Sequence, residues 1–198
     1  DLDSAEAIGK RAGERAVRRV NPGAVKSGTL PVLFDPRIGG SLVGHLMGAI
    51  GGSMIARKTS FLLDALGEAL FESAISVIDD PLRPRGLGSR AFDGEGLPTA
   101  RTAVIDKGVL NGWMMESAAA RQLGLKPTGH ASRGGSGAPG TSPSNLHLEG
   151  GTLSVAELIS DIDYGVYIHE LSGQGVNIVT GDYSRGAAGF LIEKGEII

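Results

Sequence analysis

The sequence predicts an α+β fold with mixed, largely antiparallel β-sheets packed against several helices. Segments with helical spacing of apolar residues and segments of β-rich composition alternate irregularly, without the repeated βαβ units that build a parallel sheet. The chain has 198 residues, of which 41% are hydrophobic and 21% charged, and this is enough for a buried core. Its 32 glycines are spread along the chain and indicate many tight turns.

The composition argues against several classes of protein. The formal net charge of −3 gives no reason to expect nucleic acid or an anionic membrane as a partner. The absence of cysteine excludes disulfides, thiol nucleophiles and cysteine-bound zinc, and it favours a reducing, cytoplasmic location. No apolar run predicts a membrane span, because the nearest candidate, 38–56, contains a histidine, two serines and six glycines.

The first part of the chain favours helices. Residues 3–20 have an apolar stripe and a polar face, with Asp3 as the expected N-cap and Glu6 completing a capping box. A short buried strand is expected at 30–34, and a second helix at 60–71, capped by Ser60.

A glycine-striped buried helix is predicted near residues 38–56. Glycines recur there every four residues and would share one helix face, at Gly40, Gly44, Gly48 and Gly52. Glycine costs roughly 1 kcal/mol per helical position relative to alanine, so four in one stripe require a packing or functional reason. We therefore expect this helix to lie close against a neighbour.

From residue 74 the composition favours strands. A hairpin is expected at 101–115, turning through Asp106-Lys107-Gly108, and Ser154 with Glu157 forms a second capping box. A long loop is expected at 128–145. The remaining elements are a helix at 116–125, a helix at 155–162, and strands at 74–79, 145–151, 164–171, 176–182 and 189–198, the last turning at Lys194-Gly195.

The histidines are weak candidates for a metal site. A zincin helix needs His-Glu-x-x-His, but His45 is followed by Leu46 and has Ala49 at the fourth position. His130 and His169 lie in an expected loop and strand, and a site would form only if the fold brought them to His45. We favour a packed helical histidine and assign no catalytic and no metal-binding residue.

Other motifs are also weak. The glycine-rich segment 132–142 lacks the Gly-Lys-Ser/Thr ending of a phosphate loop, and no Gly-x-Ser-x-Gly elbow occurs. His169 and Glu170 are adjacent in an expected strand and so face opposite sides. The polar run Asp182, Tyr183, Ser184 and Arg185 either stabilises a turn or offers a carboxylate and a guanidinium to a peptide.

The chain resembles the C-terminal domain of the PmbA/TldD family, in its PmbA (TldE) branch. The resemblance covers almost the whole chain and rests on five segments. These read "GHLMGAI" at 44–50, "TSFLLDALG" at 59–67, "FDGEGLPTARTAVIDKGVL" at 92–110, "LGLKPTGHA" at 123–131 and "GQGVNIVTGDYSRGAAGFLIEKGEI" at 173–197. Family members are larger, which implies that residues 1–198 form a single C-terminal domain lacking an N-terminal domain and the last β elements.

The resemblance implies a pair of related subunits that form a cytoplasmic protease acting on unfolded or small peptides. In the TldD-like subunit, the helix equivalent to 40–56 carries a His-Glu-x-x-x-His motif, and a cysteine elsewhere completes a zinc site. This chain has neither the motif nor a cysteine. The implied role is a subunit without bound zinc that shapes the substrate channel of a TldD-like partner.

Three hypotheses follow. The first is a non-catalytic subunit of a heteromeric TldD/PmbA-type metalloprotease, with peptide as substrate and zinc in the partner. The second is a self-sufficient metal-dependent hydrolase that uses His45, His130 and His169. The third is a peptide-binding homo-oligomer.

Overall fold

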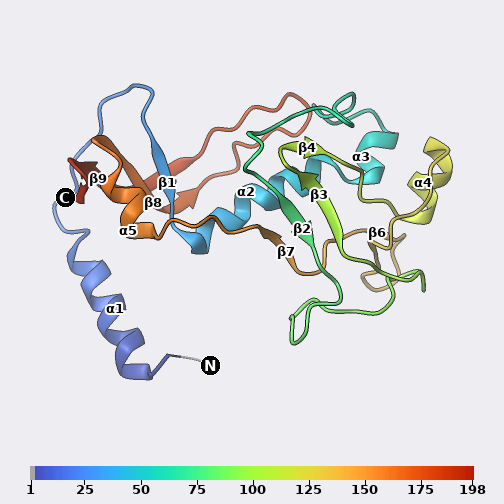
Figure 1. Cartoon of the computed structure of the whole chain (residues 1–198), viewed down its shortest axis with the longest axis horizontal. Helices are drawn as coiled ribbons and strands as arrows, with labels where there is room; N and C mark the ends of the chain where they lie inside the picture. The colour runs from blue at the N-terminus through green and yellow to red at the C-terminus, as the bar shows by residue number, and fades with distance from the viewer. Residues whose placement is uncertain (1–2) are drawn as a thin grey trace.

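The computed structural model describes residues 3–198, and within this range the chain forms five helices and three β-sheets (Figure 1). The predicted α+β class is confirmed. The helices are α1 (Ala5–Val17), α2 (Pro36–Ala49), α3 (Gly52–Ala56), α4 (Ser117–Leu123) and α5 (Val155–Ser160). The strands are β1 (Val32–Phe34), β2 (Val77–Asp79), β3 (Thr102–Asp106), β4 (Val109–Leu110), β5 (Ala131–Ser132), β6 (Gly140–Thr141), β7 (Leu146–Leu148), β8 (Tyr164–Ser172), β9 (Gly186–Glu193) and β10 (Glu196–Ile197).

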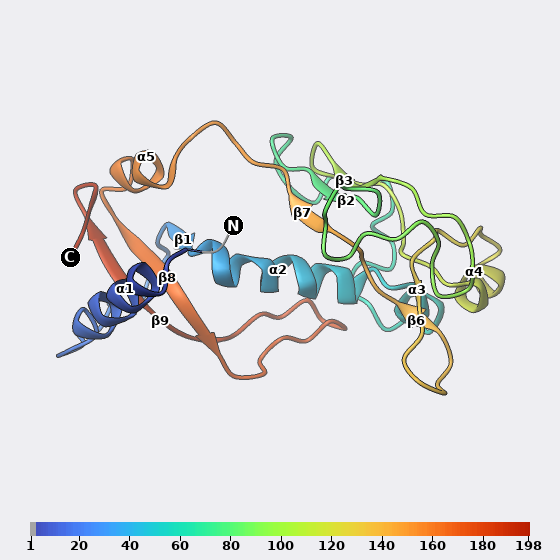
Figure 2. The same ribbon diagram turned by 90° about the horizontal axis from the view of Figure 1, so that it is seen from below.

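The elements form two lobes joined by α2 (Figure 2). In the first, which we call the open lobe, a sheet of order β1-β8-β9-β10 lies with α1 and α5; β1 is parallel to β8 and the other pairs are antiparallel. In the second, the core lobe, an antiparallel sheet of order β4-β3-β2-β7 lies with α3, α4 and the β5-β6 pair. The prediction of mixed, largely antiparallel sheets is therefore confirmed.

The core lobe holds the main hydrophobic core. Each strand of its four-stranded sheet contributes an apolar side chain, and the C-terminal end of α2 adds Met47, Ala49 and Ile50. Residues 113–115 complete the cluster between β4 and α4. In the strands of the open lobe, as far as the structure describes them, Ile192 is the one fully buried apolar side chain.

Helix α1 differs from the prediction at both ends. Its N-cap is Ser4, whose hydroxyl accepts from the Ala7 amide, while Asp3 instead pairs with Arg11. The helix ends at Val17, three residues earlier than expected. Its apolar stripe is exposed, because no neighbouring element covers it within residues 3–198.

The predicted glycine-striped buried helix is not present as such. The helix ends at Ala49, Gly51 is extended and bridges Met114, and a separate short helix, α3, follows. Three glycines of the stripe face open space, since a Cβ atom added there would meet no atom within 4 Å, at Gly40, Gly44 and Gly48. Gly52 alone has a packing reason: its Cβ would lie 2.8 Å from Met115 Cγ, and its amide donates to the Met114 carbonyl.

The predicted helix at 60–71 is wrong. Ser60 accepts from the Leu62 amide and begins a series of turns instead. The Gly67 amide donates to Leu110, and the Leu70 amide donates to Gly108, so the backbone pairs with the hairpin rather than with itself. Leucine spacing predicted a helix here, but contacts with β4 override that local preference.

Most other predicted elements are confirmed. The strand expected at 30–34 forms as β1 but is not buried, because Val32 is exposed and Leu33 and Phe34 are half-buried. The hairpin β3-β4 turns at Lys107 and Gly108, both with positive φ, and a Cβ on Gly108 would clash with the Phe71 carbonyl. The capping box of α5 forms between Ser154 and Glu157. The expected loop at 128–145 contains the small β5-β6 pair. None of the helices in residues 3–198 is long and apolar enough to cross a membrane.

Candidate functional site

The candidate site lies where α2 faces the loop 173–185, and His45 is at its centre. Arg185 Nη1 lies 3.4 Å from His45 Nε2. Because a guanidinium only donates hydrogen bonds, Nε2 is the acceptor in this contact, and a neutral His45 carries its proton on Nδ1. The ring of Tyr183 meets the imidazole edge-on, with centroids 6.0 Å apart. The fold thus unites His45 with two of the four predicted cleft residues.

The loop 173–185 is a tight reversal rather than the predicted strand at 176–182. A single bridge joins Val176 to Tyr183, and the Asn177 side chain accepts from the Val179 amide inside the turn. The Ile178 carbonyl accepts from the Phe61 amide, which ties this loop of the open lobe to the core lobe. Asn177 and Gly181 favour a turn. This preference outweighs the strand preference of the three β-branched residues between them.

The four predicted cleft residues have different environments. The Asp182 carboxylate accepts from the Thr180 hydroxyl at 2.6 Å, which agrees with the turn-stabilising interpretation. Arg185 Nε donates to the Ser172 carbonyl at 2.9 Å, and no ion pair joins it to Asp182 in the described part of the chain. Ser184 is exposed. Arg185 and Tyr183 therefore face the histidine, while Asp182 serves the loop.

A hollow of about 180 Å³ lies beside His45. Its lining is mostly apolar, and Phe61, one of its walls, is 49% exposed. The lining residues are Leu42, His45, Leu46, Phe61, Phe71, Val176, Asn177, Ile178, Gly181 and Tyr183. Chemically, the hollow can receive an apolar side chain while the Arg185 guanidinium offers its remaining N–H donors to a polar group nearby.

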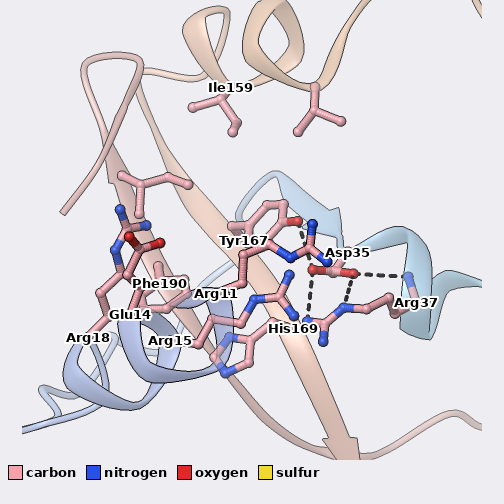
Figure 3. A pocket seen from close by; sticks show the side chains of 12 residues that line it. Arg11, Glu14, Arg15, Arg18, Asp35, Arg37, Ile159, Tyr167, His169 and Phe190 are labelled. Carbon is pink, nitrogen blue, oxygen red and sulfur yellow. Dashed lines mark hydrogen bonds and ion pairs between the residues drawn. The ribbon is translucent and has the colours of Figure 1, made fainter. Parts of the chain in front are cut away.

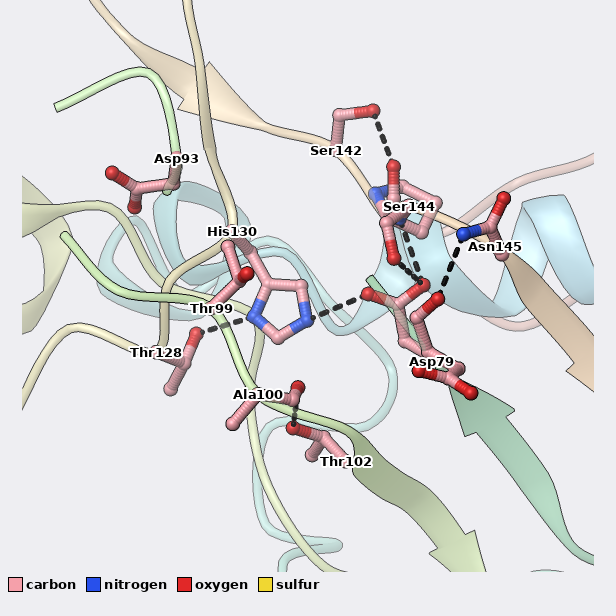
Figure 4. Close-up of polar contacts among 12 residues, drawn as sticks. Asp79, Asp93, Thr99, Ala100, Thr102, Thr128, His130, Ser142, Ser144 and Asn145 are labelled. Atoms are coloured by element: carbon pink, nitrogen blue, oxygen red, sulfur yellow. Dashed lines mark hydrogen bonds and ion pairs between the residues drawn. The ribbon is translucent and has the colours of Figure 1, made fainter. Parts of the chain in front are cut away.

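His130 belongs to a separate buried network in the core lobe (Figure 4). Its Nε2 is 3.2 Å from Asp79 Oδ2, and its Nδ1 is 2.8 Å from the Thr128 hydroxyl. The Ser144 amide and hydroxyl both donate to Asp79. Burial acts to raise the pKa of Asp79, but the hydrogen bonds from His130 and Ser144 outweigh it and hold that pKa below its usual value. Since the serine contacts the aspartate and not the imidazole, this is no Ser–His–Asp relay.

His169 lies on β8 in the open lobe, stacked on Phe190 with ring centroids 4.9 Å apart. It is buried, whereas the adjacent Glu170 is exposed and pairs with Arg19, as their opposite facing predicts. The three candidate histidines thus have separate neighbours. Within residues 3–198, no group of three histidine, cysteine, aspartate or glutamate side chains is close enough to hold a metal ion.

A polar cluster at the start of α2 was missed from the sequence. Asp35 caps the helix, pairs with the Arg37 guanidinium at 2.9 Å, and accepts from the Tyr167 hydroxyl at 3.0 Å. The hydrogen bond from Arg37 lowers the pKa of Asp35 to about 2. The signal in the sequence was Asp35-Pro36, an N-cap followed by proline at the first helical position.

Comparison with known proteins identifies the family. The family described as "PmbA/TldA metallopeptidase C-terminal domain" matches residues 27–198. The chain belongs to this PmbA/TldD family. It is 40% identical to Metalloprotease PmbA of Escherichia coli O157:H7 over 197 residues, covering 100% of this chain and 42% of that protein. It is 36% identical to the Metalloprotease PmbA homolog of Haemophilus influenzae, covering 96% of this chain and 40% of that protein.

Solved structures agree with this PmbA-type assignment. A putative modulator of a DNA gyrase from Thermotoga maritima matches with a TM-score of 0.90 and 36% identity, covering 100% of this chain and 45% of that one. TldE from Thermococcus kodakarensis matches with a TM-score of 0.84 and 28% identity, covering 97% and 44%. The resemblance to the PmbA (TldE) branch is confirmed. The chain spans less than half the length of these relatives.

Proposed function

We propose that this chain is the non-catalytic subunit of a heteromeric TldD/PmbA-type metalloprotease that acts on unfolded or small peptides. A TldD-like partner holds the zinc ion and carries out the hydrolysis. This chain contributes the surface formed by α2 and the loop 173–185, which lines the path of the peptide.

One observation carries the proposal: the Arg185 guanidinium stands beside the only histidine of α2. Arginine keeps its charge at all physiological pH values, so it opposes a divalent cation at His45 Nε2. Leu46 and Ala49 occupy the positions at which a zincin helix has its glutamate and second histidine. The residues present do not fit a zinc site, and no chemical step in this chain runs through zinc.

The same residues suit peptide binding. The hollow beside His45 receives an apolar side chain, and the exposed rings of Phe61 and Tyr183 add contact area. The Arg185 guanidinium, held by the Ser172 carbonyl, is oriented to donate to a peptide carbonyl or carboxylate.

Metal analysis and peptide cleavage test the proposal together. The purified protein alone is expected to contain no stoichiometric zinc and to cleave no peptide, and cleavage is expected on adding a TldD-like partner. Arg185→Gln should weaken peptide binding to the complex, whereas Arg133→Gln, an equal change of charge on an exposed core-lobe loop, should leave it unchanged.

Two results would overturn it. Stoichiometric zinc in the protein alone, lost in His45→Ala, would favour the self-sufficient hydrolase. Peptide binding without any effect on a TldD-like partner, by a protein that associates only with itself, would favour the homo-oligomer.

A further inference from the structure

A second hollow, of about 250 Å³, lies in the open lobe between α1 and the sheet, away from His45 (Figure 3). Side chains from six elements line it. They are Arg11, Glu14 and Arg15 of α1 with its C-cap Arg18, Asp35 and Arg37 at the start of α2, Val155 and Ile159 of α5, Tyr167 and His169 of β8, Phe190 of β9 and Ile197 of β10.

The walls of this hollow have two characters. Figure 3 shows arginines from α1 on one side of the hollow and Ile159 of α5 on another. Val155 and Ile197 also line it and add apolar surface. Two of the arginines form ion pairs, Arg37 with Asp35 and Arg11 with Asp3. Arg15 and Arg18 have no ion-pair partner among residues 3–198. Glu14 lines the same side, so two arginine charges against one carboxylate leave this wall with a net positive charge within the described chain.

His169 is the second, independent indication of a ligand. Its side chain is buried, with the residue 8% exposed, and neither ring nitrogen has a hydrogen-bond partner in the described residues. Buried polar atoms are nearly always partnered, because an unpartnered one loses its bond to water without compensation. Stacking on Phe190 orients the imidazole in the wall of the hollow.

We propose that this hollow binds a small carboxylate that carries an apolar substituent. The carboxylate is held by the arginines of α1 and by His169, and the substituent packs against Ile159 and Phe190. The inference is independent of the function proposed for the His45 site.

Size and lining favour this class over a bare inorganic anion. The hollow is below the roughly 300–1,000 Å³ of pockets for drug-sized ligands, so it suits a group about as large as one amino-acid residue. Phosphate would satisfy the arginines but would leave the apolar wall without a partner. A neutral apolar molecule would leave Arg15 and His169 without one.

Calorimetry with four probes tests the proposal: 4-methylpentanoate, its neutral amide, acetate and inorganic phosphate. The amide should bind at least about tenfold more weakly than the acid, because it lacks the charge. Acetate should also bind more weakly, since each buried CH₂ is worth roughly a fourfold change in affinity. Equal binding of acid and amide, or tighter binding of phosphate than of 4-methylpentanoate, would overturn the assignment.

Variants locate the binding. The double change Arg15→Gln and Arg18→Gln should reduce affinity at least about tenfold. Both side chains are exposed, Arg15 in the last turn of a helix with no buried residues and Arg18 at its C-cap, so the fold is expected to survive. The double change Arg121→Gln and Arg133→Gln, at two exposed arginines of the core lobe, is the charge-matched control. Unchanged affinity in the folded double variant would contradict the proposal.

His169→Phe gives a second test, because a phenyl ring retains the stacking on Phe190 but cannot bond to a carboxylate. The affinity for 4-methylpentanoate should fall while the protein remains folded. Affinity equal to that of the parent protein would show that His169 takes no part.

Proton NMR of His169 gives a readout that a purely structural role would not produce. Burial lowers the pKa of His169, with Arg19 and Arg37 acting in the same direction and Glu170 and Asp35 against it. The other charged or titratable side chains that line the hollow are Arg11, Glu14, Arg15 and Arg18 at α1 and Tyr167 on β8. Bound carboxylate favours the imidazolium, so 4-methylpentanoate should raise the pKa of His169 and the amide should not. An unchanged pKa with bound acid would refute contact between the two.

Discussion

The core lobe and the open lobe each contain a four-stranded sheet, but the side chains of the two sheets are buried to very different extents. In the core lobe, short strands surround one continuous apolar cluster that includes Ile105 and Leu110, both fully buried. In the open lobe, β8 and β9 are the longest strands of the chain, yet most of β9 is exposed. Strand length and burial are thus separate properties in this molecule.

This difference shows what holds each lobe together. A sheet gains stability mainly by covering one face with another layer, and the core lobe does so with the end of α2 and residues 113–115. The open lobe relies on the β8-β9 ladder and on the polar cluster of Asp35, Arg37 and Tyr167. We therefore expect lower local stability in the open lobe.

The largest expected effect comes from the buried acid of the core lobe. Asp79→Ala removes the acceptor of His130 and of two donors on Ser144, and should lower the free energy of unfolding by about 3–5 kcal/mol. Urea unfolding followed by the fluorescence of Trp113, which lies in the same core, measures it. Glu72→Ala, at an exposed residue, is the control. A loss below about 1 kcal/mol would mean that the network is not structural.

A matched pair of isoleucines compares the lobes directly. Ile105 and Ile192 are both 0% exposed, but Ile105 lies in the large cluster and Ile192 does not. Ile105→Ala should cost about 2–5 kcal/mol, and Ile192→Ala less than half as much, because the thinner lobe can collapse around the missing atoms. Urea unfolding and hydrogen exchange in β3 and β8 check this. Equal losses would remove the proposed difference in packing.

Acid should affect the open lobe through Asp35. Its pKa is lowered to about 2 from 3.8, so its interactions stabilise the fold above about pH 4 and are lost as the pH falls toward 2. The contribution is at most about 2 kcal/mol, because the Arg37 guanidinium is half exposed and screened by solvent. Asp35→Asn, which keeps a helix cap, should flatten this part of the pH profile of stability. A profile identical to that of the parent protein would contradict the assignment.

The smallest effect is expected at the cap of α5. Ser154→Ala removes the hydroxyl that accepts from the Glu157 amide and should cost about 1 kcal/mol. Because α5 has no buried residues, the loss should be seen as faster hydrogen exchange within α5 more than as a change in global unfolding. Thr152→Ala, just outside the helix, should have no such effect. Faster exchange in both variants would point to general loosening of the segment.

The features that the sequence predicts well are those that local chemistry decides. The α5 capping box, the Lys107-Gly108 turn and the helix at Ser117–Leu123 each depend on a few neighbouring residues. The helix expected at 60–71 failed because its backbone bonds to residues some forty positions away, as the Gly67 amide does to Leu110.

The candidate sites were only partly predictable for the same reason. The polar run ending at Arg185 stood out in the sequence, but its contact with His45 spans 140 positions and depends on the fold. No sequence pattern indicated that His130 and Asp79 would pair, because they lie in a loop and a strand that come together only in the folded core lobe. The glycine periodicity at positions 40, 44, 48 and 52 predicted close packing, yet of these four glycines only Gly52, in α3, is closely packed.

Helix α2 connects the two candidate sites, and its length fixes how far His45 is rotated about the helix axis relative to Asp35. Asp35 at its N-terminus lines the open-lobe hollow, His45 lies further along, and Met47 to Ile50 anchor its far end. One residue inserted after Gly40 would rotate everything beyond it by about 100° and advance it by about 1.5 Å. Asp35 would keep its place while His45 turned away from Arg185. We therefore expect substitutions at Gly40, Gly44 and Gly48, where an added side chain meets open space, to be tolerated more readily than an insertion or deletion in α2.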